Sequence, residues 1–223
     1  MASHPDLSPS DVSPPDLSPR AARTRAALIA AGFDLLAERP IDAIPIDEVV
    51  ARAGVAKGSF FNHFTDKQAF AEAIAADVRL QLEEQVGRAN AGVADPVERI
   101  AGGMRVGAAF ALSDRKRTAV LLRSHGTSTA RAHPLNKGLV QDVDAACAAG
   151  LLRPEARDSG VLYWLGLCQI LMVNLVEQRP DPADAQRRVN EMIVLGLTGL
   201  GVDAARAASV AQQAIAKLGA VAD

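Results

Sequence analysis

A short segment at residues 56–64 carries the side chains with the clearest potential for chemistry. On a helical wheel, Phe60 and Phe64 share one side, whereas Gly58 and Asn62 lie on the opposite side. The apolar side could anchor a short helix, and the other side offers an amide donor and acceptor beside a position without a side chain. Because an α-helix fits the major groove of B-DNA and amides can read base edges, this pattern predicts a helix that enters that groove.

Other residue combinations in the chain do not predict catalysis or a metal site. Ser124 and His125 are adjacent, but they lack the Gly-x-Ser-x-Gly sequence that exposes a nucleophilic serine. His125 and His133 are not spaced as two ligands on one helix face, and no cysteine completes a site. The glycine-rich stretch 196–201 has the wrong residue order for a dinucleotide loop and follows a predicted helix. We therefore expect no enzyme activity, no cofactor and no metal ion.

The elements that would position the 56–64 segment are predicted from apolar spacing. Apolar residues recur every three or four positions over 20–40, which predicts a first helix that stops at a proline. A second, two-turn helix is predicted over 45–54, with proline at its start and glycine at its end. Thr65 and Gln68 stand three apart, as in a capping box, and should begin a long helix that reaches about residue 86. Two short helices joined by a tight turn form the pattern of a helix-turn-helix.

The remaining sequence also predicts helices. Asp95-Pro96 and Asp181-Pro182 each combine an N-capping acid with proline at the first helical position. The polar stretch 113–138 shows no regular period, and no segment alternates as a strand would. The chain contains 43 alanines but only 4% aromatic residues, a composition that favours helix over sheet. We therefore predict an all-α fold. Besides the helix at Asp95, further helices are expected at about 139–149, 154–177, 182–199 and 203–218.

The first nineteen residues and the overall composition bear on location and partners. Residues 1–19 repeat the pentamer Pro-Asp-Leu-Ser-Pro, and such Pro/Ser-rich sequence predicts a disordered tail. They contain no basic residue and no apolar stretch, so they do not resemble a secretory signal. The two cysteines, Cys147 and Cys168, are too few for a disulfide framework. Together these features predict a cytoplasmic protein, and its net charge of −2 requires any nucleic-acid surface to be local.

Three stretches around the predicted helix-turn-helix resemble the DNA-binding domain of the tetracycline-repressor (TetR) family of transcriptional regulators. They read RTRAALIAAGFDLLAERP, IDEVVAR and AGVAKGSFFNHFTDKQAFAEAI. The resemblance covers about 20–72, a quarter of the chain. It implies a three-helix DNA-binding domain at 20–72 and a helical ligand-binding and dimerisation domain at 73–223, whose last two long helices pair with their copies in a four-helix bundle.

The resemblance also implies which residues meet DNA. Asn62 would face DNA, and Lys67 would touch a phosphate at the start of the long helix. From its position opposite Phe60 and Phe64 and its amide chemistry we expect Asn62 to read a base, with contact to only a phosphate or water as the alternative. The sequence departs from the family pattern at Phe61, where tyrosine is common, and at Ile44-Pro45, where a capping Thr or Ser is common. The expected DNA-binding residues are Arg25, Lys57, Gly58, Ser59, Phe61, Asn62, His63 and Lys67. For His63 a partly buried packing role, and for Arg25 a solvated position, remain open as alternatives.

The second domain is expected to bind a small molecule and a second copy of the chain. Residues 160–176 contain no charge, but they are shorter than the roughly twenty residues that span a bilayer, so burial against protein, including a homodimer partner, is predicted instead. Leu171 and Leu175 should be covered by apolar surface. The expected pocket is largely apolar, with Arg105 and Arg123 as its nearby charges. Candidate pocket residues, for which packing in the core or in a dimer interface is the alternative, are Met104, Phe110, Tyr163, Trp164, Cys168 and Met172.

These patterns and the resemblance together predict a dimeric transcriptional regulator, a repressor that binds a palindromic double-stranded operator and that a small-molecule effector releases. Two alternatives from other classes are an all-helical enzyme and a protein-binding adaptor that retains the helix-turn-helix as a scaffold. The missing catalytic constellation argues against the enzyme. The polar outer face of residues 57–62 argues against the adaptor.

Overall fold

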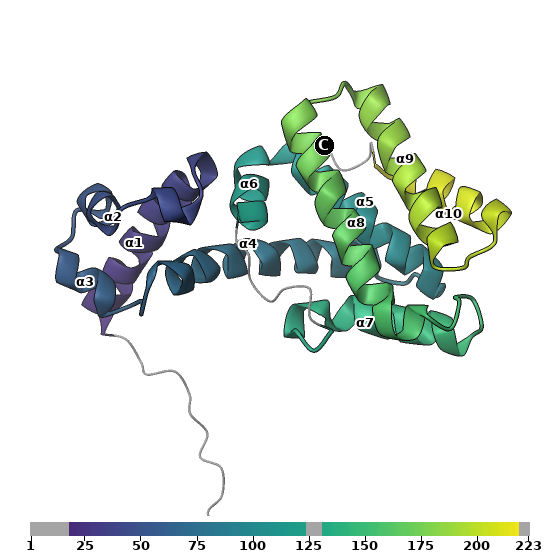
Figure 1. Ribbon diagram of the computed structural model, residues 1–223, viewed down its shortest axis with the longest axis horizontal. Helices are drawn as coiled ribbons and strands as arrows, with labels where there is room; N and C mark the ends of the chain where they lie inside the picture. The colour runs from purple at the N-terminus through teal and green to yellow at the C-terminus, as the bar shows by residue number, and fades with distance from the viewer. Residues whose placement is uncertain (1–17, 124–130, 219–223) are drawn as a thin grey trace, which may run out of the picture.

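The computed structural model describes residues 18–123 and 131–218, and every regular element in these two ranges is helical (Figure 1). The predicted all-α fold is therefore confirmed. The predicted tail, apart from Ser18 and Pro19, and the Ser124-His125 pair lie outside the described residues. The elements are α1 (Pro19–Glu38), η1 (Ile41–Ala43), α2 (Ile46–Ala53), α3 (Lys57–Phe61), α4 (Lys67–Ala89), α5 (Pro96–Ser113), α6 (Arg115–Arg123), η2 (Pro134–Asn136), α7 (Lys137–Ala148), α8 (Ala156–Gln178), α9 (Pro182–Gly199) and α10 (Ala204–Ala216).

Helix starts in this chain are set by short capping side chains. Ser18 accepts a hydrogen bond from the amide of Ala21, so α1 begins at Pro19, inside the segment predicted to be a tail. Asp95 caps α5 as the sequence predicts. The start of α4 differs from the prediction, because Asp66 accepts from the Ala69 amide at 2.8 Å and is the N-cap in place of Thr65. An ionised carboxylate one residue later is the stronger partner for the helix N-terminus.

Helices α1, α2 and α3 form a small unit at one end of the molecule, and α4 runs from this unit along the remaining helices (Figure 1). Helix α1 packs directly on α4. A Cβ atom on Gly32 would lie only 2.2 Å from the Phe70 ring, so glycine is required for this approach. The first half of α4 therefore belongs to the N-terminal core, while its second half packs on α5 and α6. One continuous helix thus connects the two parts of the chain.

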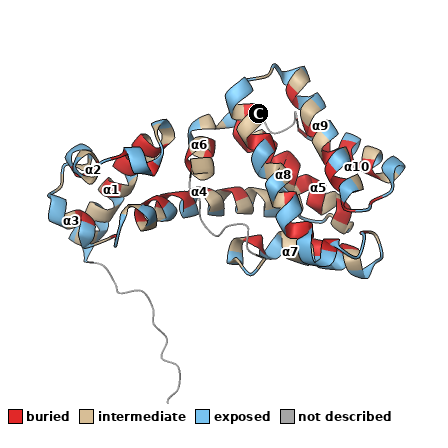
Figure 2. Ribbon diagram, viewed as in Figure 1, coloured by how far each residue is buried: buried red, intermediate tan, exposed pale blue. Residues whose placement is uncertain are grey.

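Helix α5 forms the centre of the second part and is the most extensively buried helix (Figure 2). It packs against α4, α6, α7, α8, α9 and α10. The stretch 113–138, predicted to be irregular, contains α6. The Asp114 carboxylate accepts from the Arg117 amide at 2.9 Å, and Val120 and Thr118 are fully buried. Three basic residues at its start conceal this short apolar face in the sequence.

Helix α8 is apolar on most of its surface, and only part of that surface is covered within the protomer. Among the described helices it alone is long and apolar enough to cross a membrane. Leu171 and Leu175 are buried inside the protomer, at 3% and 0% exposure. By contrast, Leu162 and Ile170 are each 58% exposed, and exposed positions recur along α8 (Figure 2). Leu195 of α9, at 64% exposure, extends this uncovered apolar surface, which we call the α8–α9 face.

Candidate DNA-binding surface and ligand cavity

The turn between α2 and α3 depends on Gly54. Its φ of 65° lies in the left-handed region, which side-chain-bearing residues adopt only at a cost. The amide of Gly54 donates to Ala51, and the amide of Val55 donates to Val50 at 3.0 Å, so the last carbonyls of α2 are satisfied. This compact turn sets α3 across α2 in the helix-turn-helix arrangement that the sequence predicts.

Aromatic packing holds α3 against the helices behind it. Phe60 and Phe64 are buried, and their ring centroids lie 5.1 and 4.8 Å from that of Phe70 on α4. These edge-on contacts anchor the inner side of α3. The outer side carries Gly58 and the exposed Asn62. A Cβ atom added to Gly58 would meet no other atom within 4 Å, so the space beside it is open. The short helix therefore presents a free and largely polar surface.

The other residues expected at DNA lie around α3 in different surroundings. Lys57 is exposed and forms an ion pair with Asp47 of α2 at 2.8 Å. Phe61 is 54% exposed, whereas Ser59 and His63 are half-buried. The Arg25 guanidinium lies over the Phe64 ring, 5.3 Å from its centroid, so it packs beside α3 instead of extending freely into solvent.

Lys67 has a structural role that the sequence does not suggest. Its Nζ donates hydrogen bonds to the carbonyls of Ile41, Asp42 and Ile44, each at 3.2 Å. These three acceptors engage all three ammonium hydrogens. A phosphate contact would therefore require Nζ to leave the carbonyls at the end of η1. In this structure Lys67 ties the start of α4 to the segment that precedes α2.

Helix α6 links the N-terminal unit to the second part of the chain. Lys116 forms an ion pair with Asp34 of α1 and lies 5.5 Å from the centroid of the Phe33 ring. At the other end of α6, Arg123 donates to the carbonyl of Leu36 at 2.6 Å. Contacts at both ends therefore hold α6 on α1.

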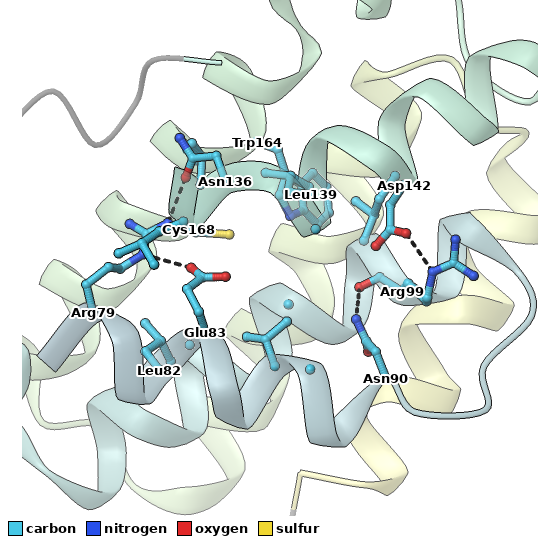
Figure 3. Close-up of a pocket in the computed structure, with 18 of the residues that line it drawn as sticks. Arg79, Leu82, Glu83, Asn90, Arg99, Asn136, Leu139, Asp142, Trp164 and Cys168 are labelled. Atoms are coloured by element: carbon cyan, nitrogen blue, oxygen red, sulfur yellow. Dashed lines mark hydrogen bonds and ion pairs between the residues drawn. The ribbon is translucent and has the colours of Figure 1, made fainter. Parts of the chain in front are cut away.

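A cavity of about 540 Å³ lies in the second part of the chain (Figure 3). This volume is within the usual range for sites that bind small organic molecules. Helices α4, α5, α6, α7 and α8 supply its walls, so α4 and α6 border the cavity and also touch α1. Its apolar lining residues include Leu82, Val86, Ile100, Leu121, Leu122, Leu135, Leu139, Trp164, Leu165 and Met172.

Charged residues line two separate regions of the cavity wall. At one, Arg79 donates to Glu83 at 2.7 Å and to the Asn136 side chain at 2.9 Å. At the other, Arg99 donates to Asp142 at 2.6 Å. Figure 3 shows these two groups apart from each other, with Trp164 and Leu139 between them. Burial raises the pKa of the Asp142 carboxyl and outweighs the opposing effect of the Arg99 guanidinium.

The candidate pocket residues divide into two groups. Trp164, Cys168 and Met172 line the cavity. Burial raises the pKa of the Cys168 thiol to about 12, so this thiol is not a reactive nucleophile. The other three candidates do not line it. Met104 and Phe110 are buried in the core, and the hydroxyl of Tyr163 on α8 lies 3.5 Å from the Leu195 carbonyl of α9.

The expected charges of the pocket also need correction. Arg105 and Arg123 do not line the cavity, which instead contains the pairs Arg79–Glu83 and Arg99–Asp142. Arg105 borders a separate hollow of about 30 Å³ beside α10. The spacing of four residues between Arg79 and Glu83 is the only local signal for either pair. Such spacing is common on solvated helix faces, and the 43-residue separation of Arg99 and Asp142 gives no local signal.

Comparison with known proteins identifies the N-terminal unit. Residues 28–74 match the family model of bacterial regulatory proteins of the tetR family. This range contains most of α1, all of α2 and α3, and the first turns of α4. No curated protein sequence matches the chain significantly.

Solved structures share the fold over most of the chain at low sequence identity. RolR in complex with resorcinol is 24% identical, with a TM-score of 0.61 over 87% of this chain and 95% of that one. A putative tetR-family regulator from Shewanella sp. PV-4 is 14% identical, with a TM-score of 0.68 over 79% and 97%. NalD, the secondary repressor of the MexAB-OprM efflux pump in Pseudomonas aeruginosa, is 18% identical, with a TM-score of 0.60 over 81% and 98%.

The matched residues coincide with the helix-turn-helix whose geometry is described above, and the helices that follow have the arrangement of regulators in this family. Regulators of this kind are not enzymes, which agrees with the sequence-based expectation. The chain therefore carries a TetR-family DNA-binding domain and has the fold of regulators of this family.

Proposed function

We propose that the chain is a cytoplasmic, homodimeric repressor that binds a palindromic operator and leaves it when a small molecule occupies the cavity. One observation carries this proposal: the walls of the cavity include α4 and α6, the two helices that also contact α1 of the DNA-binding unit. A ligand in the cavity would therefore contact elements whose position sets that of α3.

The α8–α9 face supports the dimer. Leu162, Ile170 and Leu195 expose most of their side chains, and Gly166 between the first two leaves room for a close approach. Exposed apolar side chains in such a cluster mark protein interaction sites on soluble proteins. Two copies joined through this face by a twofold axis would present two α3 helices, which is the arrangement that reads a palindrome.

The outer face of α3 supports DNA reading. Asn62 can pair its amide with the N6 and N7 edge of adenine, and Gly58 on the same side allows a close approach to the bases. Lys57, Ser59 and Phe61 would contact flanking bases or phosphates. We also assign His63, Arg25 and Lys67 to the rim of this surface, where Lys67 would have to exchange carbonyl contacts for a phosphate.

The effector's action would be a shift between two conformations. Leu121 and Leu122 of α6 face the cavity, while Lys116 and Arg123 of the same helix hold Asp34 and the Leu36 carbonyl of α1. A bound molecule that moves α6 would change the angle of the DNA-binding unit. RolR, which has this fold, binds the small molecule resorcinol, and this supports a small-molecule effector here. NalD, which also has this fold, is a repressor, and this supports a repressor role here.

Selection of operators from a random DNA library by the full-length protein tests the proposal. We expect an enriched sequence with twofold symmetry, bound by one dimer, with half-sites about one helical turn apart or slightly more. A variant with Asn62→Ala and Ser59→Ala should enrich no such sequence. Enrichment of no sequence by the wild-type protein would refute the repressor and favour a protein-binding adaptor.

A further inference from the structure

We infer that the cavity takes an uncharged molecule with an apolar body that donates hydrogen bonds at both of its ends, as a diol or bisphenol does. This inference rests on the proposed function only in treating the occupant as the effector. The chemistry of the cavity wall carries the rest.

The charges in the wall compensate one another. Arg79 is matched by Glu83, and Arg99 is matched by Asp142, so these two groups contribute no net charge to the cavity. Arg99 is further engaged by the carbonyls of Val93 and Ala94, at 2.9 and 3.0 Å. A ligand carboxylate or ammonium group would thus meet no opposite charge that lacks a partner. Placing an additional charge in such a site costs free energy unless a new partner compensates it.

Each end of the cavity retains an acceptor. Glu83 accepts from Arg79 through one oxygen, and Asp142 accepts from Arg99 through one oxygen. Within residues 18–123 and 131–218, the second oxygen of each carboxylate has no hydrogen-bond donor. Both residues line the cavity, and Figure 3 shows their carboxylates on opposite sides of the open space. An ionised carboxylate only accepts hydrogen bonds, so the matching ligand group is a donor such as a hydroxyl.

The surface between these ends is apolar. Leu139 and Trp164 lie between the two charged regions, and Leu82 lines the cavity beside Arg79 (Figure 3). All three side chains offer contact surface but few polar atoms. Gly103 on α5 also lines the cavity and has no side chain that would take up space there. Within 4 Å an added Cβ would meet only Val86, at 3.9 Å. An apolar or aromatic body would bury its surface here, while two hydroxyl groups reach Glu83 and Asp142.

Matched probes of one shape test the chemical class. Isothermal titration calorimetry on the full-length protein would compare 4,4′-dihydroxybiphenyl with 4,4′-dimethoxybiphenyl and with biphenyl-4,4′-dicarboxylate, and resorcinol with its dimethoxy and dicarboxylate counterparts. We expect at least one diol to bind at least about tenfold more tightly than both of its counterparts, since they lack the donors or add charge. Binding of neither diol, or equal or tighter binding of a counterpart, would overturn the inference.

Variants of the acceptors identify the site. Glu83→Gln and Asp142→Asn should each weaken diol binding about tenfold, because a hydrogen bond to an ionised acceptor is stronger than one to a neutral amide. Glu84→Gln is the matched control, because Glu84 is exposed on the same helix and lies outside the cavity. A disturbed fold would weaken the diol and the dimethoxy compound alike, whereas a lost acceptor weakens only the diol. Equal effects of Glu83→Gln and Glu84→Gln would overturn the assignment.

Operator binding separates this inference from the proposed function. A diol that binds with the expected preference but leaves operator affinity unchanged would support the ligand class and refute the effector role. A dicarboxylate that binds the cavity and releases the operator would support the effector role and refute the ligand class.

Discussion

Ile170 on the α8–α9 face provides a quantitative test of the proposed dimer. The side chain is 58% exposed in the protomer. Full burial of an isoleucine contributes roughly 1.5–3 kcal/mol, so covering this exposed fraction corresponds to about 0.9–1.7 kcal/mol per copy. A twofold dimer contains the residue twice, and alanine keeps one methyl group, so Ile170→Ala should weaken the dimer by about 2 kcal/mol. With a factor of ten for each 1.4 kcal/mol, the dimer dissociation constant should rise about 30-fold.

Sedimentation equilibrium over a concentration series measures this constant, and circular dichroism shows whether the monomer retains its helices. Leu80→Ala is the matched control, since Leu80 is also a large exposed apolar residue, at 47% exposure, but lies on α4. The reasoning is refuted if the two variants dissociate equally, or if the wild-type protein is a folded monomer at the highest concentrations examined.

Three further predictions concern DNA reading, the start of α4 and pH. Asn62→Ala should weaken binding to the preferred operator by roughly 1–3 kcal/mol, and much less on an operator changed at the base pair it reads; equal losses on all operators in gel-shift titrations would make it a positioning contact. Lys67→Met should lower the free energy of unfolding in urea by about 1.5–3 kcal/mol, through loss of its three carbonyl contacts. Unchanged stability with a salt slope reduced by about one unit would instead identify a phosphate contact. Asp95→Ala should destabilise the protein by about 1–2 kcal/mol at neutral pH, because this carboxylate caps α5 and binds Arg206 at 2.7 Å. Burial acts to raise the pKa of Asp95, but hydrogen bonds from Arg206 and the Val97 amide outweigh it and hold the pKa below 3.8. The stabilisation should therefore be present above pH 3.8 and lost as the pH falls below it, so thermal melts of wild type and variant should converge there; a constant difference would contradict the assignment.

The sequence alone was sufficient for most helices because their boundary signals are local. Asp95-Pro96 and Asp181-Pro182 begin α5 and α9, where each carboxylate accepts from an amide two or three residues ahead. Gly54 ends α2 for an equally local reason, its left-handed backbone. The anchors Phe60 and Phe64 are both buried as predicted, although α3 ends at Phe61. Phe64 stays on the same side because its amide still donates to the Phe60 carbonyl one turn earlier.

Local patterns failed where the deciding partner is distant in sequence. The short apolar face of α6 is concealed by neighbouring basic residues, and only packing against α1, α4 and α5 defines it as a helix. Tyr163 and Trp164 are adjacent on α8, yet one is 39% exposed and the other 1%, because only one side of that helix meets α5. Their different environments could not be distinguished from residue type.

The sequence by itself determined the all-α class, the helix-turn-helix and the apolar character of α8, because each depends on contacts within a few residues. Only the tertiary structure decided which surface of α8 stays uncovered, that Lys67 holds three carbonyls, and that Arg79, Glu83, Arg99 and Asp142 line one cavity. A charged side chain usually lies on a solvated helix face. It becomes part of a binding site only when packing of distant helices encloses it together with its partner, and that packing is a property of the whole chain.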